Sequence, residues 1–270
     1  MAIFSFVIVN YNTQESLRRC LTSILKFTQL EKREIIVIDN NSQDASQAMI
    51  KEFYFKDVSY IFNSSNLGFS SACNQGALVA KGDYLFFLNS DAYLVSDILL
   101  EIEKIFSDNS KIAAIFPVLK DSKLDLETRF FGRFPSFKNT IFKKSEKKLR
   151  LETKKLIKNN DILKVDWISG ASMVVKNTAF FSVGGFDKTF FMYFEDIDFC
   201  QKLKKLNYEC VITPDDIFLI HERGLSFKGD NKLKKKYYYQ SQNYYFKKHY
   251  GSIGMYLLKF FRFLYLVLFK

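Results

Sequence analysis

Two short segments contain the carboxylates that could carry chemistry in this chain. One is Asn89-Ser90-Asp91, directly after an apolar run at residues 84–88. A carboxylate there could hold a hard divalent cation, Mg²⁺ or Mn²⁺, that in turn bridges phosphate oxygens. The other is the pair Glu195-Asp196, which follows a run of mostly aromatic residues at 190–194. Aromatic neighbours exclude water, which raises the pKa of a carboxyl group as a general base requires.

These residues also have a structural interpretation. Acidic residues in the first turn of a helix are stabilised by the helix dipole, which would account for Glu195 and Asp198 without any catalysis. His221, one of two histidines in the chain, follows an apolar run at residues 217–220. A lone histidine is usually structural.

Polar turns follow four predicted strands, which are residues 3–9, 34–39, 58–62 and 84–88. Taken singly, each turn is more typical of a helix cap or an Asx turn than of a binding site. In an open α/β sheet, however, ligands bind at the carboxyl ends of the strands. Four polar turns at one sheet edge therefore predict a binding site. The turn residues are Asn10, Tyr11, Asn12, Asp39, Asn41, Asn66, Gly68, Phe69, Asn89 and Ser90.

Helical spacing of apolar residues alternates with these strands, and further strands are predicted at residues 112–117 and 171–175. The predicted helices are residues 17–25, 43–53, 70–80 and 97–106. This alternation predicts an α/β fold with a mainly parallel, Rossmann-like sheet and helices on both faces. We expect one catalytic domain over residues 1–230, with a basic insertion or loop at 120–165, and a C-terminal tail over residues 231–270.

The net charge of +11 is concentrated in two segments. Residues 143–158 hold eight basic and two acidic side chains, and residues 228–248 hold seven lysines and one aspartate. Such patches suit an anionic surface, for example membrane headgroups. A solvated, lysine-rich face is an equally good interpretation of the first patch.

The tail ends in an apolar stretch, residues 253–269, that Lys259 and Arg262 interrupt. A central Lys or Arg costs about 2.5–3.5 kcal/mol in a spanning helix, so an amphipathic helix lying in the headgroup region fits better. We therefore expect a peripheral protein at the cytoplasmic face of the inner or plasma membrane. The alternative is a helix packed on a partner subunit, as in a homodimer.

Two further features set the expected compartment. The first residues lack the basic start of a signal peptide. The four cysteines lack the spacing of a zinc site or of a disulfide framework, so they are expected to be core residues in a reducing compartment.

An ordered set of motifs over residues 3–226 resembles glycosyltransferase family two, which has a GT-A fold. Within that family the set is most similar to the rhamnosyltransferase-like group of bacterial cell-surface polysaccharide synthesis, which makes O-antigen or capsule. The motifs are Val9-Asn10-Tyr11-Asn12, Asp39-Asn40-Asn41-Ser42, Asn66-Leu67-Gly68-Phe69 with Asn74 and Gly76, Asn89-Ser90-Asp91, Trp167 with Gly170 and Ala171, Gly184-Gly185-Phe186-Asp187, Phe191-Met192-Tyr193-Phe194-Glu195-Asp196 with Asp198, and His221 with Ser226.

The resemblance implies a role for each motif. Asp39 would contact a pyrimidine base, Asp91 and His221 would hold Mg²⁺ or Mn²⁺, and Asp196 would be the general base, with Glu195 as the alternative. Asn89 departs from the family pattern, because it stands where the D-x-D motif has its first aspartate. The other implied donor-binding residues are Val9, Asn10, Tyr11, Asn12, Asn41, Asn66, Gly68, Phe69, Asn74, Asn89 and Ser90. The implied acceptor or sugar pocket contains Trp167, Gly170, Ala171 and Phe194.

The implied reaction is an inverting transfer of a sugar, rhamnose being one candidate, from a dTDP- or UDP-sugar to a hydroxyl of a lipid-linked or cell-surface glycan. Three alternatives stay open: a nucleotidyltransferase, a non-catalytic protein that binds nucleic acid or glycan, and an inactive scaffold. A nucleotidyltransferase would carry a glycine-rich, basic loop where this chain has Asn10-Tyr11-Asn12. The basic segments lie away from the polar turns and no nucleic-acid motif is present, so no nucleic-acid partner is expected.

Overall fold

The structure is a computed structural model that describes residues 2–54, 56–137, 161–222 and 231–268, together with residues 140, 156 and 157. Most of the predicted basic patch at 143–158 and the motif residue Ser226 lie outside the described residues.

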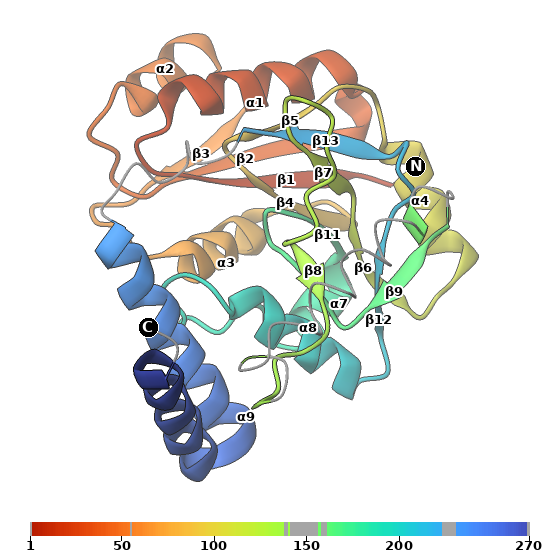
Figure 1. The fold of residues 1–270 in the computed structure, drawn as a ribbon. Helices are drawn as coiled ribbons and strands as arrows, with labels where there is room; N and C mark the ends of the chain where they lie inside the picture. The colour runs from red at the N-terminus through yellow and green to blue at the C-terminus, as the bar shows by residue number, and fades with distance from the viewer. Residues whose placement is uncertain are drawn as a thin grey trace.

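A mixed sheet of eight strands forms the centre of the molecule, in the order β3-β2-β1-β4-β11-β6-β12-β9 (Figure 1). Strands β3, β2, β1 and β4 are parallel, as the alternation of elements predicts. β11 runs antiparallel to both β4 and β6, and β9 runs antiparallel to β12. The bounds are β1 Phe4–Asn10, β2 Arg33–Asp39, β3 Ser59–Phe62, β4 Tyr84–Asn89, β6 Ile112–Phe116, β9 Leu163–Val165, β11 Ser172–Lys176 and β12 Glu209–Ile212.

Two smaller sheets lie beside this one. The first has the order β5-β13-β7, where β13 pairs antiparallel with β5 and parallel with β7. The second pairs β8 with β10. Their bounds are β5 Ala92–Leu94, β7 Val118–Lys120, β8 Phe131–Gly132, β10 Trp167–Ile168 and β13 Phe218–His221. Only β13 coincides with a strand-like run of the sequence, residues 217–220, and the other four short strands were not predicted.

Helices cover both faces of the main sheet, with α1 and α2 on one face and α3, α7 and α8 on the other (Figure 1). The change of face follows from topology, because crossovers between parallel strands are right-handed and the strand order reverses after β3. The bounds are α1 Gln14–Phe27, α2 Ser46–Phe53, α3 Phe69–Val79, α4 Leu99–Asp108, α7 Asn177–Ser182 and α8 Glu195–Lys205, with a short 3₁₀ helix at Leu30–Lys32. The predicted strands and helices of residues 3–117 and the strand at 171–175 are confirmed within a few residues at each end.

The C-terminal helix α9, Asn231–Leu268, reverses direction at Gly251, where φ is 75°. Its second half therefore lies alongside the first (Figure 1). Arg262 joins the two halves, since its Nη2 donates to Gln242 Oε1 at 2.6 Å and its guanidinium lies 4.4 Å from the centre of the Tyr239 ring. Lys259 is exposed instead, so of the two basic residues that interrupt the apolar stretch only Arg262 takes part in the packing between the halves.

The first half of α9 packs against the domain. Its residues Tyr245 and Phe246 form a buried apolar cluster with Phe190 and Phe194, and Leu258 of the second half completes it. Across the residues that the structure describes, no helix combines the length and the apolar character that crossing a bilayer demands.

Candidate functional site

The polar turns meet at the carboxyl ends of β1, β2 and β4, where a buried network joins them. Asn10 Nδ2 donates to Asp39 Oδ2 at 2.7 Å and to Ser42 Oγ at 3.0 Å. Thr13 Oγ1 donates to Asn10 Oδ1 at 2.6 Å and lies 2.8 Å from Ser90 Oγ. The register places Asn10 beside Asp39 and Val9 beside Asn89, which explains why residues distant in sequence share one network.

Asp39 is fully buried and is used to hold this network together. Its Oδ1 accepts hydrogen bonds from Ser42 N at 2.9 Å and from Gln47 Nε2 at 2.8 Å, while Oδ2 accepts from Asn10. The implied contact between Asp39 and a pyrimidine base stays a prediction. In this conformation the carboxylate ties the turn after β1 to the turn after β2.

Two asparagines in the turns adopt left-handed backbone conformations, Asn12 with φ 56° and Asn41 with φ 65°. Asparagine tolerates this region because its short side chain bonds locally. Asn12 Oδ1 accepts from Gln43 N at 2.6 Å, which ties the first turn to the second. Tyr11, which directly precedes Asn12, is 36% exposed and lies at the rim of the network.

The third turn contacts the segment that precedes Glu195 and Asp196. Asn66 Oδ1 accepts from Gly68 N at 3.0 Å, and Phe69 N donates to Phe191 O at 2.8 Å. Gly68 has φ 82°, and a Cβ there would lie 2.4 Å from Phe191 O. The residue must therefore be glycine for this close approach.

Asn74 has a structural task that explains its position in a motif. Its Nδ2 donates to Phe186 O at 2.8 Å, and its Oδ1 accepts from Phe186 N at 3.0 Å. Asn74 thereby holds the backbone after Gly185 against α3. The implied contact of Asn74 with the donor stays a prediction.

Asp91 and His221 lie side by side, as the resemblance implied. The antiparallel pairing of β5 with β13 places His221 opposite Ala92, and His221 Nε2 lies 3.3 Å from Asp91 Oδ1. The imidazole of His221 lies between two carboxylates, because its Nδ1 is 2.8 Å from Glu127 Oε2. Burial opposes the charged imidazole, but the hydrogen bonds that it donates to Asp91 and Glu127 outweigh the burial and raise the pKa of His221 to about 9.

The carboxylate of Asp91 and the imidazole of His221 are suitable ligands for a divalent cation that also binds phosphate. A carboxylate is a ligand that Mg²⁺ and Mn²⁺ accept, and an imidazole can bind a metal once its proton has left. Within the described part of the chain, no group of three or more His, Cys, Asp or Glu side chains is placed to hold a metal ion. Two protein ligands would leave the remaining positions for waters and diphosphate oxygens, as is usual for Mg²⁺ at nucleotides.

Glu195 and Asp196 open helix α8, as predicted, and both are buried. Burial raises the pKa of Glu195, and the neighbouring charge of Asp196 raises it further. Burial also raises the pKa of Asp196, although hydrogen bonds, including those from the backbone of Ile197 and Gly170, oppose the shift. Glu195 Oε2 is buried and has no hydrogen-bond partner among the residues that the structure describes. The raised pKa values suit a general base.

Gly170 and Ala171 connect the two carboxylate centres. Gly170 N donates to Asp196 Oδ2 at 3.3 Å, and Ala171 O accepts from Asn89 N at 3.0 Å. A Cβ on Gly170 would lie 2.8 Å from the Phe69 ring. Trp167 stands nearby in β10, where its Nε1 donates to Arg133 O at 2.9 Å. Of the predicted acceptor residues, Gly170 thus contacts Asp196 directly, and the contact of the set with an acceptor stays a prediction.

The segment before α8 is strained, and α9 holds it in place. Tyr193 and Phe194 are consecutive left-handed residues, with φ 71° and 69°. Such backbone persists only where surrounding contacts impose it. Ser241 Oγ of α9 donates to Met192 O at 2.7 Å, and the Tyr238 ring lies 5.4 Å from that of Phe194.

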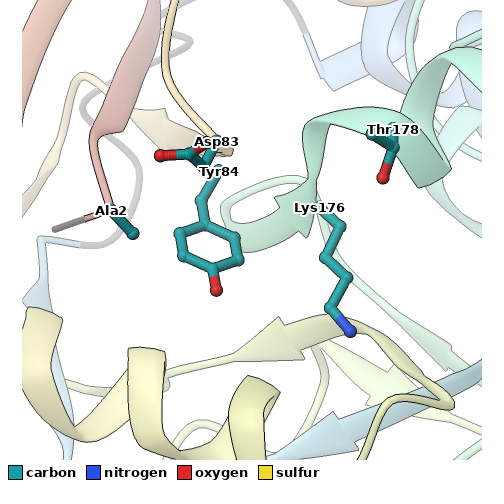
Figure 2. A pocket seen from close by; sticks show the side chains of 5 residues that line it. All are labelled: Ala2, Asp83, Tyr84, Lys176 and Thr178. Atoms are coloured by element: carbon teal, nitrogen blue, oxygen red, sulfur yellow. The ribbon is translucent and has the colours of Figure 1, made fainter.

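A separate hollow of about 510 Å³ lies at the opposite edge of the sheet, lined by Ala2, Asp83, Tyr84, Lys176 and Thr178 (Figure 2). Tyr84 begins β4, whereas the candidate site lies at the end of that strand. None of the predicted site residues lines this hollow.

Two buried contacts escaped the sequence analysis. Glu127 belongs to the segment assigned to an insertion or loop, and nothing in its spacing connects it to His221, 94 residues away. Asp198 was assigned to helix capping, but its Oδ1 lies 2.8 Å from Lys248 Nζ and 2.7 Å from His249 Nε2, both in α9. Only the contact of Asp198 with α9 had a signal in the sequence, namely the basic residues of the tail, which need acidic partners when the tail packs against the domain.

Residues 5–163 match the model of glycosyl transferase family 2. The chain belongs to this family. The match contains all four polar turns, with Asp91 in the last of them, while the Glu195-Asp196 pair lies after it.

Several curated proteins are similar to this chain at low identity. Rhamnosyltransferase WbbL of Escherichia coli is 26% identical over 203 residues, which are 73% of this chain and 75% of that protein. N-acetylglucosaminyl-diphospho-decaprenol L-rhamnosyltransferase of Mycobacterium tuberculosis is 24% identical over 244 residues, covering 82% and 76%. Low-salt glycan biosynthesis hexosyltransferase Agl10 of Haloferax volcanii is 25% identical over 208 residues, and the match spans 75% of this chain but only 62% of the relative.

Solved structures confirm the GT-A fold. GalNAc-T7, determined with UDP, GalNAc and Mn²⁺, aligns with a TM-score of 0.66 at 18% identity over 90% of this chain and 48% of its own. Mannosyltransferase PcManGT of Pyrobaculum calidifontis, in complex with GDP-Man and Mn²⁺, aligns with a TM-score of 0.62 at 14% identity over 92% and 64%.

Proposed function

We propose that this family 2 protein transfers a sugar, with inversion, from a dTDP- or UDP-linked donor to a hydroxyl of a lipid-linked or cell-surface glycan. The observation that carries the proposal is the junction at Gly170 and Ala171, where Asp196 and the Asn89-Ser90-Asp91 segment are held by adjacent residues. A donor diphosphate at Asp91 and an acceptor hydroxyl at Asp196 would then be neighbours. The rhamnosyltransferases among the relatives support rhamnose as the sugar to test first.

The residues of the chain would divide the work as follows. Asp91 and His221 would hold Mg²⁺ or Mn²⁺, which when bound neutralises the charge of the leaving diphosphate. Asp196 would accept the proton of the acceptor hydroxyl as that oxygen attacks the anomeric carbon from the side opposite the diphosphate. The network of Asn10, Asp39 and Ser90 would keep the donor end of the site rigid.

The test is transfer by the purified full chain from dTDP-rhamnose and a panel of UDP-sugars to a prenyl-diphosphate-linked N-acetylglucosamine, with Mn²⁺ or with chelator. We expect product with one donor class, lost on chelation, and the opposite anomeric configuration in the product. Thermal unfolding with the same nucleotides supplies a second measurement, because a ligand that binds only the native state raises its stability. Absence of both transfer and stabilisation with every donor would refute the proposal.

We also propose that the protein lies on the cytoplasmic face of a membrane through the second half of α9. Its outward residues are exposed and apolar at helical spacing, with Ile253 at 76%, Tyr256 at 63%, Phe260 at 55% and Phe263 at 62% exposure. Exposed Lys259 among them suits an anionic interface. Aromatic residues with adjacent lysine are typical of a helix lying among headgroups rather than of a dimer seam.

Sedimentation with vesicles of anionic phospholipid tests this placement. The double change Phe260→Ser and Phe263→Ser should reduce bound protein at least tenfold, and Leu78→Ser, an equally exposed site on α3, should not. Deleting the tail would be a poorer test, because Leu258 and Arg262 belong to the packed part of the molecule. A concentration-dependent dimer that the double change abolishes, without any vesicle binding, would assign the face to a second copy instead.

A further inference from the structure

Glu127 is a buried carboxylate for which the proposed reaction has no direct use. Its side chain is almost fully buried, and its backbone N donates to Leu119 O of β7 at 2.8 Å. β7 pairs with β13, so Glu127 stands next to the end of the strand that carries His221. Two backbone contacts therefore place this carboxylate beside the imidazole: the pairing of β7 with β13 and the hydrogen bond from Glu127 N to Leu119 O.

The imidazole of His221 is held on several sides. Glu127 Oε2 lies 2.8 Å from Nδ1, and the Phe130 ring meets the imidazole edge to face, with centroids 5.2 Å apart. The other oxygen of Glu127, Oε1, lies 3.7 Å from Arg129 Nη2. These contacts leave Nε2 directed at Asp91, 3.3 Å away.

The two ring nitrogens of a histidine cannot be exchanged when one of them is a metal ligand. A carboxylate that accepts the hydrogen of one nitrogen fixes the tautomer and the ring orientation, and it makes the other nitrogen a better ligand. In this chain Glu127 accepts from Nδ1, which reserves Nε2 for the side where Asp91 lies. No other arrangement of the ring would keep both contacts.

We propose that Glu127 is a positioning residue that directs Nε2 of His221 at the cation bound with Asp91. The inference rests on the metal site of the proposed function and adds a residue to it that no family motif in the sequence contains. Loss of a carboxylate that orients a metal-binding histidine typically weakens metal affinity 10- to 100-fold.

The experiment measures Mn²⁺ binding to the full-length protein by electron paramagnetic resonance, with UDP and separately with dTDP, so that no catalytic turnover is needed. We expect Glu127→Gln to raise the Kd for Mn²⁺ by about 10- to 100-fold. In a His221→Ala background the same change should have no further effect, because Glu127 acts through His221. Glu209→Gln, which removes a partly exposed carboxylate that bonds Lys164 at the far end of β12, is the matched control and should leave the Kd unchanged.

The outcomes separate this inference from the proposed function. If the wild-type protein binds Mn²⁺ with nucleotide and His221→Ala weakens binding, but Glu127→Gln does not, the role of Glu127 is overturned and the metal site stands. An equal loss in both backgrounds would also overturn it, since the effect would not pass through His221. If the wild type binds no Mn²⁺ with either nucleotide, the metal site itself fails, and the inference fails with it. Should Glu127→Gln not fold, Glu127→Asp keeps the charge but shortens its reach, and the same weakening and the same dependence on His221 are expected.

Discussion

His249 Nε2 of α9 lies 2.7 Å from Asp198 Oδ1, two residues along α8 from the proposed base. Lys248 Nζ lies 2.8 Å from the same oxygen and 2.7 Å from Asp187 Oδ2. The C-terminal helix is thus fastened by charge to the helix that presents Glu195 and Asp196. Apolar packing adds to these polar contacts, since Phe190 and Phe194 lie in one buried cluster with Tyr245 of α9.

Removing Asp198 should loosen this attachment. Asp198→Asn leaves Lys248 and His249 without their charged partner. The Asp198 carboxylate is fully buried but Lys248 is exposed, so the cost should lie below the roughly 3–5 kcal/mol of a fully buried ion pair. We expect a loss of roughly 1.5–3 kcal/mol in the free energy of unfolding, the usual range for hydrogen bonds to a charged group, measured by urea denaturation. Glu15→Gln, at an exposed pair with Arg18, should change stability by less than about 1 kcal/mol. Equal effects of the two changes would contradict a structural role for Asp198.

The same contact should depend on pH in a defined direction. Burial opposes the charged forms of Asp187 and Asp198, but hydrogen bonds, including those from Lys248, outweigh it, so the pKa of each lies below its usual range. A lowered folded pKa gives stability that is complete above the ordinary value of about 3.9 and is lost as the pH falls through the folded value. The stability difference between wild type and Asp187→Asn should therefore be constant from pH 8 to 5 and shrink below pH 4. A difference that grew on acidification would contradict the assignment.

Asp196→Asn should lower kcat by about 10²- to 10⁴-fold, the usual contribution of a general base, with little change in the Kd of the donor nucleotide. Glu195→Gln is the comparison that decides between the two carboxylates. Single-turnover rates and nucleotide titrations on both variants separate chemistry from binding. A larger loss of rate in Glu195→Gln would transfer the role of base to Glu195.

Gly68→Ala tests the close approach between the third turn and the segment before α8. The new methyl group would meet Phe191 O at 2.4 Å, on a backbone that already has φ 82°. Gly184→Ala is a matched control, because Gly184 has φ 75° but open space where its Cβ would stand. Strain alone costs roughly 1–3 kcal/mol, so both variants should lose stability. We expect only Gly68→Ala to lose transfer activity beyond its loss of stability, measured by denaturation and by rate at a temperature where both variants are folded.

The alternation of strands and helices was predictable because the central strands are buried on both faces. β1 and β4 therefore appear in the sequence as continuous apolar runs of ordinary strand length. The small sheet of β5, β13 and β7 was missed, since strands of three or four residues leave little pattern. That sheet brings Asp91 and His221 together, so their proximity followed from the resemblance and not from the spacing of residues.

The tail was only partly predictable. Its helical and apolar character was evident, but the reversal at Gly251 was not recognised, although glycine is the residue that most readily adopts φ above zero at the end of a helix. Because the reversal was missed, the packing of Arg262 against Gln242 and Tyr239 in the first half of α9 was not predicted. No pattern in α8 itself indicates the attachment through Asp198, because an acidic residue in the first turn of a helix already has a sufficient local explanation.

Strand β11 runs against its neighbours β4 and β6, so it is the beginning of this strand, and not its end, that faces the site. Gly170 and Ala171 enter the site from a connection that none of the parallel strands uses. Under the proposed function, the residues that would bind the acceptor and those that would bind the donor therefore reach the site on separate connections. Exchanging the stretch from β9 to β11 between members of the family should then change the acceptor without changing the donor.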